Sequence, residues 1–417
     1  MTTMDVIRSF EGVCPVCGQK HETAVHDVRI GHGLVHEVGT ILKENGFPET
    51  LLLVADRKTL AASEGILDSL QGFRVELKIF DSIRVARMEH VEELQHLIRG
   101  REIGVLSVGS GSVNDPCRLA AARENKLLCI FGTAPSMDGF ASYSSPIVDG
   151  AFKASYAAKS PEVIIGDTAI LARAPKELKA AGFGDMMAKY VGLIDWEISH
   201  LLIGEPCCPR VEALTRSAAD EIIAMADRVM AQDEETAGAI FASLLKTGIA
   251  MSFMKNSRPA SGSEHIIAHL IECVQLRDGI IPNFHGEDIG VCTLETLKAY
   301  RRLAEKETIT AQKEQVDWQK VYDFYGSMAD DVRKLNEPDT ITDLVDPARL
   351  EACWPKIREI IASVPDEATV RDAMKRAGCK LTVEDIGKPQ RLFDDCMTYS
   401  PFMRRRLTLL RLKGMIN

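Results

Sequence analysis

Short apolar runs alternate with helical patterns through residues 50–150 of the chain. The strand-like runs are residues 50–56, 73–80, 103–109 and 126–135. The segments with apolar positions at helical spacing are residues 88–99 and 116–126. Such short apolar or alternating runs are typical of strands, and strands that alternate with helices form parallel sheets. A sheet of this kind binds ligands at the carboxyl ends of its strands.

The pattern changes after residue 174. The helical stretches that follow, with almost no strand-like alternation, are residues 175–202, 211–232 and 235–254. We therefore predict an N-terminal α/β domain with a parallel sheet over residues 1–170, in which residues 1–30 are an extra N-terminal segment. An all-helical C-terminal domain is predicted over residues 171–417.

Composition and charge exclude several classes of protein. The 417 residues carry a net charge of −10, and no dense basic stretch is present to bind a nucleic-acid backbone. No uninterrupted apolar run approaches the roughly 20 residues that span a bilayer, and the N-terminus lacks the features of a secretory signal. The eleven scattered cysteines are typical of reduced thiols. We expect a cytoplasmic protein with no membrane span.

A glycine-rich stretch, GSGSVND at residues 109–115, lies between a predicted strand and a predicted helix. Gly109 and Gly111 let the backbone approach a diphosphate, and the N-terminus of the following helix favours an anion. Asn114 stands where the dinucleotide fingerprint has its third glycine. A glycine turn at this place is also common without a ligand, so the stretch alone leaves phosphate binding open.

The loop at residues 132–146, GTAPSMDGFASYSSP, follows another predicted strand. Thr133, Ser136 and Ser142 can donate hydrogen bonds to phosphate or ribose, and Asp138 can accept one from a substrate hydroxyl. Solvated loops often have the same composition, so a loop without a ligand is the alternative.

Asp56 is the acid at the end of the strand predicted over residues 50–56. Beside an adenine ribose it would accept from the hydroxyls and repel a 2′-phosphate, which favours NAD over NADP. A helix cap or turn residue is the alternative interpretation.

Three of the ten histidines fall within 21 residues. His265 and His269 lie one helical turn apart, so their imidazoles face the same way, and His285 follows in NFHGEDIGV. This grouping favours a metal site or a catalytic histidine over isolated core residues. Asp185 follows two glycines in GFGDMM, and its local sequence favours a helix cap.

A second group of metal-binding side chains is CPVCGQKH at residues 14–21, with His26 beyond it. Cys14, Cys17 and His21 are suitable zinc ligands. Their spacing is not that of a known zinc finger, and no second C-x-x-C pair completes four thiolates. A turn with two reduced cysteines is the simpler interpretation.

Five motifs of this chain resemble those of the sn-glycerol-1-phosphate dehydrogenases: GSGSVND, TAPSMDGFAS, GFGDMMAKYVGLIDW, RPASGSEHIIAHLIE and HGEDIGV, in this order. That family belongs with glycerol dehydrogenase, iron-containing alcohol dehydrogenases and dehydroquinate synthase. The resemblance covers roughly residues 30–300 and, more loosely, the helical C-terminus. It implies a dehydroquinate synthase-like fold, in which an NAD-binding α/β domain precedes a helical metal- and substrate-binding domain.

The resemblance also implies roles for single residues. Asp185, His265 and His285 match the family's three metal ligands. His269 and Asp138 match residues that act on the substrate, and Asp185 also contacts it. The positions that match NAD contacts are Asp56, Gly109, Ser110, Gly111, Ser112, Val113, Thr133, Ala134, Pro135, Ser136 and Ser142.

The activity implied is the reversible, NAD(P)H-dependent reduction of dihydroxyacetone phosphate to sn-glycerol 1-phosphate, a step of phospholipid biosynthesis. One divalent metal, zinc or nickel, would assist it, and NAD is the expected cofactor because of Asp56. The alternatives are a glycerol dehydrogenase for an unphosphorylated polyol, a dehydroquinate synthase-like lyase, which has Glu where Asp185 stands, and a metal-free binding module.

Two basic residues shortly before the histidine pair are candidates for the substrate phosphate. Arg258 and Lys255 precede His265 by one or more helical turns, although a solvated helix end would look the same. We expect small-molecule partners only, and a homo-oligomer, taken as a dimer from the family resemblance.

Overall fold

A six-stranded parallel sheet forms the core of the N-terminal part in the computed structural model, which describes residues 2–150 and 152–417. The strand order is β3-β10-β7-β6-β4-β5. The strands are β3 Asp27–Gly31, β4 Thr50–Asp56, β5 Arg74–Phe80, β6 Gly104–Gly109, β7 Leu128–Gly132 and β10 Val163–Asp167. The parallel sheet and its strands β4 to β7 were predicted from the apolar runs and are confirmed.

The sequence pattern did not reveal β3 and β10. β3 is a sheet-edge strand whose residues are only partly buried or exposed, so its sequence DVRIG lacks a long apolar run. β10 is fully buried but short, and its sequence VIIGD has only three consecutive large apolar residues. Strand length and edge exposure therefore account for both omissions.

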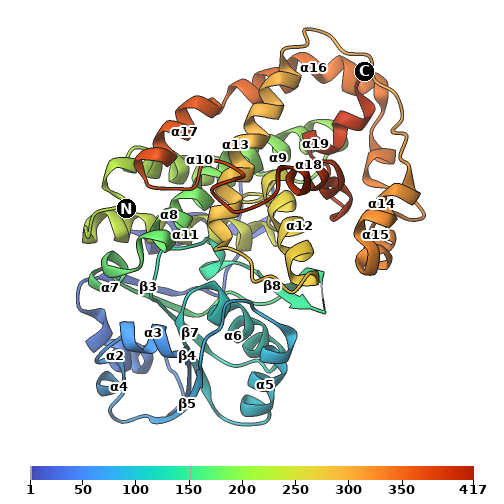
Figure 1. Ribbon diagram of the computed structural model, residues 1–417. Helices are drawn as coiled ribbons and strands as arrows, with labels where there is room; N and C mark the ends of the chain where they lie inside the picture. Colours follow the sequence, from blue (N-terminus) through green and yellow to red (C-terminus); the bar gives the residue numbers. More distant parts are fainter. Residues whose placement is uncertain (1, 151) are drawn as a thin grey trace.

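Alternate residues of the strands face opposite layers of helices. Leu53, Leu106 and Phe131 pack in one cluster with α2 and α4, whereas Leu52 and Val105 pack in another with α5 and α6. The helices of these layers are α2 Val38–Glu44, α3 Arg57–Ala62, α4 Ile66–Ser69, α5 Met88–Ile98 and α6 Gly111–Arg123. Figure 1 shows this α/β part in blue and teal in the lower half of the view. Burial on both faces is what makes the strands continuously apolar.

Helices dominate the chain after Asp167, as predicted (Figure 1). They are α7 Thr168–Arg173, α8 Lys176–Met187, α9 Lys189–Ile203, α10 Pro209–Ile223, α11 Glu234–Met254, α12 Ser263–Arg277, α13 His285–Ala304, α14 Trp318–Tyr325, α15 Ala329–Asn336, α16 Pro347–Ala362, α17 Glu367–Arg376, α18 Gln390–Tyr399 and α19 Leu409–Leu412. The helical stretch at residues 175–202 is two helices, because the chain breaks its helix at Ala188.

α11 is the one helix of the described residues that is long and apolar enough, by length and composition, to cross a membrane. Most of that apolar window, 83%, is buried inside the structure. Phe241 and Leu245 of this helix belong to the same hydrophobic cluster as Ile130 and Ile164 of the sheet. α11 therefore serves as a core helix that joins the sheet to the helical region, and a domain boundary at residue 170 stays a prediction.

Two small hairpins complete the fold. The strands β8 Ser144–Asp149 and β9 Phe152–Ala157 pair antiparallel and follow the loop at residues 132–146. At the N-terminus, α1 Thr3–Phe10 is followed by β1 Gly12–Val13, which pairs antiparallel with β2 Lys20–His21. This N-terminal segment packs against α11 of the helical region.

Candidate active site

A cavity of about 1150 Å³ opens where the carboxyl ends of the strands face the helical region. The predicted site residues that line it are Asp56, Ser110, Gly111, Ser112, Val113, Thr133, Ala134, Ser136, Asp138, Ser142, His265, His269 and His285. Gly109, Pro135 and Asp185 lie behind this lining rather than in it. The volume of this cavity is large enough for a dinucleotide beside a small substrate.

The glycine-rich stretch forms the turn from β6 to α6. β6 ends at Gly109, Ser110 is the extended residue before the helix, and α6 begins at Gly111. The free amides of a helix N-terminus are directed at this end of the cavity, as an anion site requires. Asn114 is fully buried, and its Oδ1 accepts a hydrogen bond of 2.6 Å from Ser107 Oγ. Asn114, at the third glycine position of the fingerprint, thus connects α6 to β6 by a side-chain hydrogen bond, where a glycine would allow close backbone packing.

Asp56 combines the two roles that the sequence left open. It is the N-cap of α3, where its Oδ1 accepts from the backbone N–H of Thr59 at 2.8 Å. It also lines the cavity at the end of β4, next to the turn that begins α6. The capping contact therefore holds the Asp56 carboxylate in place at this end of the cavity.

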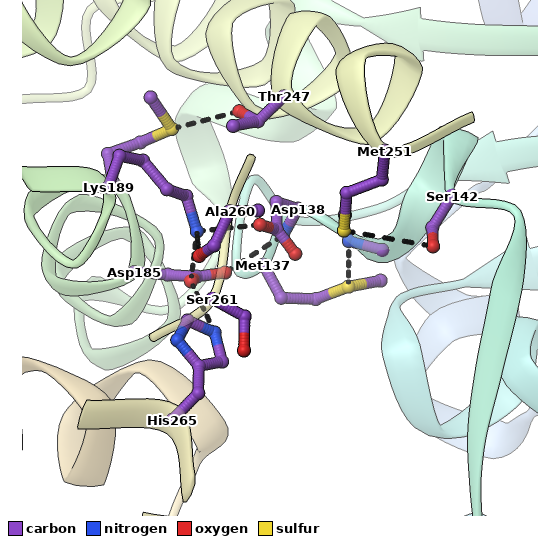
Figure 2. A network of polar contacts seen from close by, with 12 residues as sticks. Met137, Asp138, Ser142, Asp185, Lys189, Thr247, Met251, Ala260, Ser261 and His265 are labelled. Atoms are coloured by element: carbon purple, nitrogen blue, oxygen red, sulfur yellow. Dashed lines mark hydrogen bonds and ion pairs between the residues drawn. The ribbon is translucent and has the colours of Figure 1, made fainter. Parts of the chain in front are cut away.

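Three metal-binding side chains converge from three helices. Asp185 lies in α8, His265 in α12, and His285 begins α13, and one ligand atom from each lies within 4.8 Å of the others. Asp185 Oδ1 is 3.5 Å from His265 Nε2 (Figure 2). Asp185 is inside α8 and not at its N-terminus, so the interpretation as a helix cap is wrong. A fully buried carboxylate that faces two imidazoles is suited to a divalent transition metal.

Glycines allow α8 to approach its neighbours this closely. A Cβ on Gly182 would lie 1.9 Å from the carbonyl oxygen of Pro135, in the loop after β7. A Cβ on Gly286 would lie 1.9 Å from the carbonyl oxygen of Ala181 in α8. These contacts hold Asp185 close to both the loop and His285. They explain why glycine stands at 182, shortly before Asp185, and at 286, directly after His285.

Gly286→Ala is expected to separate α8 from α13, because its methyl group would overlap backbone atoms that cannot move alone. We predict a loss of about 1–3 kcal/mol in the free energy of unfolding, measured by chemical denaturation, together with weaker metal binding. Gly290→Ala is the matched control, since its Cβ would meet only the flexible end of Met374 and the Cα of Gly184. Equal stability of the two variants would contradict this packing.

Two residues that the sequence analysis missed support the carboxylate and the imidazole. Lys189 Nζ donates to Asp185 Oδ1 at 2.8 Å and to Asp138 Oδ2 at 2.6 Å (Figure 2). Glu264 Oε1 lies 2.6 Å from His265 Nδ1, which leaves Nε2 directed at Asp185. A carboxylate behind a histidine is the usual support of a metal ligand. Lys189 was detectable in principle, because it stands four residues after Asp185 on the same helix.

Charges in this cluster are strongly coupled. Burial opposes the ionisation of Asp185, but the adjacent Lys189 and His265 outweigh it and hold the pKa of its carboxyl well below the usual value. Burial raises the pKa of Asp138, and the negative charge of Asp185 raises it further, although Lys189 opposes both. Asp185 is therefore the carboxylate that stays ionised, as a metal ligand must.

His269 lies beside His285, with a distance of 5.4 Å between the ring centroids. Burial lowers the pKa of both imidazoles well below the usual value, and the positive charge of Lys153 adds to this effect. Lys153 comes from β9, lines the cavity and forms an ion pair of 2.6 Å with Glu272. Both histidines are thus neutral near pH 7, which is the form that binds metals and accepts protons.

Neither basic residue that the sequence suggested for the substrate phosphate lines the cavity. Arg258 is only 2% exposed, and its guanidinium forms an ion pair with Glu205 and a hydrogen bond to Ser199. Lys255 forms a surface ion pair of 2.7 Å with Glu22. Both assignments are wrong, because sequence distance from His265 does not reveal the direction in which a side chain leaves the loop.

Comparison with known proteins places the chain in a family. Residues 29–175 match the model of the iron-containing alcohol dehydrogenases. The glycerol-1-phosphate dehydrogenase [NAD(P)+] of Methanothermobacter thermautotrophicus is 35% identical over 271 residues, which are 64% of this chain and 76% of that protein. The chain belongs to the glycerol-1-phosphate dehydrogenase family. The resemblance noted from its five motifs is confirmed.

Other relatives match a larger share of the chain. The glycerol-1-phosphate dehydrogenase [NAD(P)+] of Halalkalibacterium halodurans is 28% identical over 405 residues, which are 94% of each chain. Among solved structures, the NADH-dependent butanol dehydrogenase A of Thermotoga maritima aligns with a TM-score of 0.62 at 14% identity, over 95% of this chain and 94% of that one. At such low identity the likeness to that dehydrogenase supports the fold alone. It confirms the expected fold, a parallel α/β sheet followed by a helical region.

Proposed function

We propose that this chain is a metal-dependent oxidoreductase that reduces dihydroxyacetone phosphate to sn-glycerol 1-phosphate with NAD(P)H, and that the reaction is reversible. The observation that carries the proposal is the convergence of Asp185, His265 and His285 at a cavity that also contains the glycine turn of α6. The names of the relatives supply the substrate and the cofactor. A binding module without catalysis would have no use for this donor set.

The three side chains would hold one divalent ion. When bound, such an ion polarises the carbonyl oxygen of the substrate as a Lewis acid. We infer zinc or nickel from the family resemblance, and one carboxylate with two imidazoles suits both. Lys189 keeps Asp185 ionised and in place, and Glu264 fixes the tautomer and the orientation of His265.

The cofactor would lie along the cavity from Asp56 to the histidines. The amides that begin α6 would bind the pyrophosphate, and Asp56 would accept from the adenine ribose. Hydride comes from the nicotinamide. Thr133 and Ser142, which are both buried at the cavity wall, would hold the nicotinamide half.

His269 is the residue we assign to proton exchange at the substrate hydroxyl. Burial and the positive charge of Lys153 lower the pKa of this imidazole well below its usual value. A neutral His269 accepts the hydroxyl proton in the direction of oxidation and returns a proton from water in the direction of reduction. Asp138, bonded to Lys189, would orient the neighbouring substrate hydroxyl.

Lys153 is the cation we assign to the substrate phosphate. Lys153 lines the same cavity as His269 and His285, and its ammonium group is held there by the ion pair with Glu272. Its partner Glu272 is on the same helix as His269, one turn further on. A phosphate would compete with Glu272 for this ammonium group, and charge-assisted bonds to a dianion are strong.

Asp56→Ser tests the choice of cofactor. Serine preserves the N-cap of α3 but removes the negative charge at the ribose end, so NADP should be accepted more readily. We predict that the ratio of kcat/KM for NADPH to that for NADH rises about tenfold or more, which corresponds to about 1.4 kcal/mol. An unchanged ratio at unchanged stability would remove Asp56 from the cofactor site.

Product stereochemistry tests the proposed reaction itself. The metal-reconstituted protein is incubated with NAD and either sn-glycerol 1-phosphate or sn-glycerol 3-phosphate, and NADH formation is followed. The proposal expects turnover of the first enantiomer only. Equal turnover of both enantiomers, or turnover of sn-glycerol 3-phosphate alone, would overturn it.

A cytoplasmic location and a homodimer are also proposed from the family resemblance.

A further inference from the structure

A second group of metal-binding side chains lies outside the catalytic cavity. Cys14, Cys17 and His21 come from the N-terminal segment, and Cys208 comes from the start of α10. One ligand atom from each lies within 4.8 Å of the others, although Cys208 is separated from Cys14 by 194 residues in sequence. None of the four lines the catalytic cavity. The fourth ligand that the sequence seemed to lack is therefore supplied by the helical region.

Two distances within this group match those of a tetrahedral zinc site. Cys14 Sγ and Cys208 Sγ are 3.8 Å apart, and Cys17 Sγ is 3.4 Å from His21 Nε2. Ligands about 2.3 Å (sulfur) and about 2.0 Å (nitrogen) from a tetrahedral ion lie about 3.8 Å apart for two sulfurs and about 3.5 Å apart for a sulfur and a nitrogen. A disulfide would need about 2.05 Å between sulfurs, so Cys14 and Cys208 are not bonded to each other.

The backbone around Cys14 and Cys17 forms a tight turn between β1 and β2. Cys14 N–H donates to the carbonyl oxygen of Gln19 at 2.8 Å, and Gly18 N–H donates to the carbonyl oxygen of Cys14 at 2.9 Å. Gly18 has a φ of +72°, which a residue with a side chain adopts only with strain. This turn holds Cys14 and Cys17 in one group of metal-binding side chains.

Cys208 is the N-cap of α10, a helix of 15 residues, and Pro209 follows it as the first helical residue. Its side chain makes no capping hydrogen bond to that helix. Cys14 and Cys208 are both buried, and their sulfurs lie next to each other. Two adjacent buried thiolates cannot both form without a cation between them.

His21 completes the group as a fully buried imidazole. Its ring is stacked near Phe253 and Phe10, with centroid distances of 5.4 Å and 6.3 Å. Its Nδ1 makes no hydrogen bond to any of the described residues. Its Nε2 lies 3.4 Å from Cys17 Sγ, and the imidazole nitrogen of histidine is a common zinc ligand.

We propose that Cys14, Cys17, His21 and Cys208 bind a structural zinc ion that fastens the N-terminal segment to α10. Four protein ligands leave no open position, so this ion would take no part in the reaction. The link has a consequence for the active site, because the loop before Cys208 contains Glu205, and Glu205 holds Arg258 shortly before the metal-binding helix α12. The ion thus anchors both the N-terminal segment and a support of α12.

Cobalt substitution of the full-length protein tests the proposal. The catalytic ligands are one carboxylate and two imidazoles, so only the second site can give the near-ultraviolet charge-transfer bands of cobalt bound to thiolates. The proposal expects these bands, tetrahedral visible bands, and a second metal ion per chain after zinc reconstitution. The measurement is made without added thiol reductant, which would itself bind cobalt. If the protein binds cobalt but shows no thiolate bands, the proposal is overturned. This outcome does not depend on the folding of any variant.

Substitutions assign the bands to residues. Cys17→Ser and Cys208→Ser should each lose the thiolate bands and one metal ion per chain, whereas Cys207→Ser should keep both. Cys207 is the matched control because it neighbours Cys208 but is not part of the group. Asp185→Asn should lose the other metal ion and keep the thiolate bands. Bands that survive in Cys208→Ser, or that disappear in Cys207→Ser, would contradict the ligand set.

Discussion

Asp185→Asn is expected to remove the catalytic metal ion and nearly all activity. Asparagine has the same shape as aspartate but lacks the negative charge that faces His265 and Lys189. One of the three charged or imidazole ligands of the ion is therefore lost. The buried ammonium group of Lys189 also keeps only one of its two carboxylate partners, Asp138. We predict a fall in kcat/KM of about 10³-fold or more, since polarisation of the carbonyl depends on the ion. The measurements are metal content per chain and the rate of NADH oxidation with dihydroxyacetone phosphate.

One readout and one control variant separate loss of the ion from loss of the fold in Asp185→Asn. NADH binding, followed by fluorescence, should persist because the proposed cofactor contacts are on the sheet side of the cavity. Asp220→Asn is the matched control, since Asp220 accepts from the hydroxyl of Tyr190 and does not line the cavity. An Asp185→Asn protein that keeps its catalytic ion and its activity would show that the ligand assignment is wrong.

Lys153→Met is expected to remove the preference for a phosphorylated substrate. Methionine retains much of the length of lysine and lacks its charge, so the loss should fall on binding of the phosphate rather than on packing. We predict that kcat/KM for dihydroxyacetone phosphate falls about 10- to 100-fold, as expected for a lost charge-assisted contact of about 1.5–3 kcal/mol. Turnover of unphosphorylated dihydroxyacetone should change little.

Lys255→Met is the matched control for this prediction, because Lys255 has an exposed side chain that pairs with Glu22 away from the cavity. Lys153→Arg should recover part of the preference, since it restores the charge. If Lys153→Met lowered the activity on both substrates equally, Lys153 would be a structural partner of Glu272 and not the phosphate contact.

The sequence was most informative where one local pattern determined one element. The strands β4, β6 and β7 are buried on both faces, so their apolar runs are long, and the turn after β6 carries its own glycines. The pairing of His265 with His269 was also local, because four residues make one helical turn. These features depend on residues close in sequence, which a pattern along the chain can reveal.

The remaining parts of the site depend on contacts between distant segments. Asp185 looked like a helix cap because its local sequence does not reveal that Gly182 brings α8 onto the loop after β7. Cys208 could not be connected with the C-x-x-C pair because 194 residues separate it from Cys14. Arg258 looked available for a phosphate, although the folded chain pairs it with Glu205. Side-chain direction and tertiary pairing are set by packing, which a single sequence does not display.

The most direct test of the proposed function compares two ketones. NADH oxidation is measured with dihydroxyacetone phosphate and, separately, with unphosphorylated dihydroxyacetone, on the metal-reconstituted protein and on the same protein after chelation. We predict a strong preference for the phosphate ester that disappears when the catalytic ion is removed. Equal or faster turnover of the unphosphorylated ketone, or a rate that chelation leaves unchanged once metal analysis shows the catalytic ion to be absent, would contradict a metal-dependent glycerol-1-phosphate dehydrogenase.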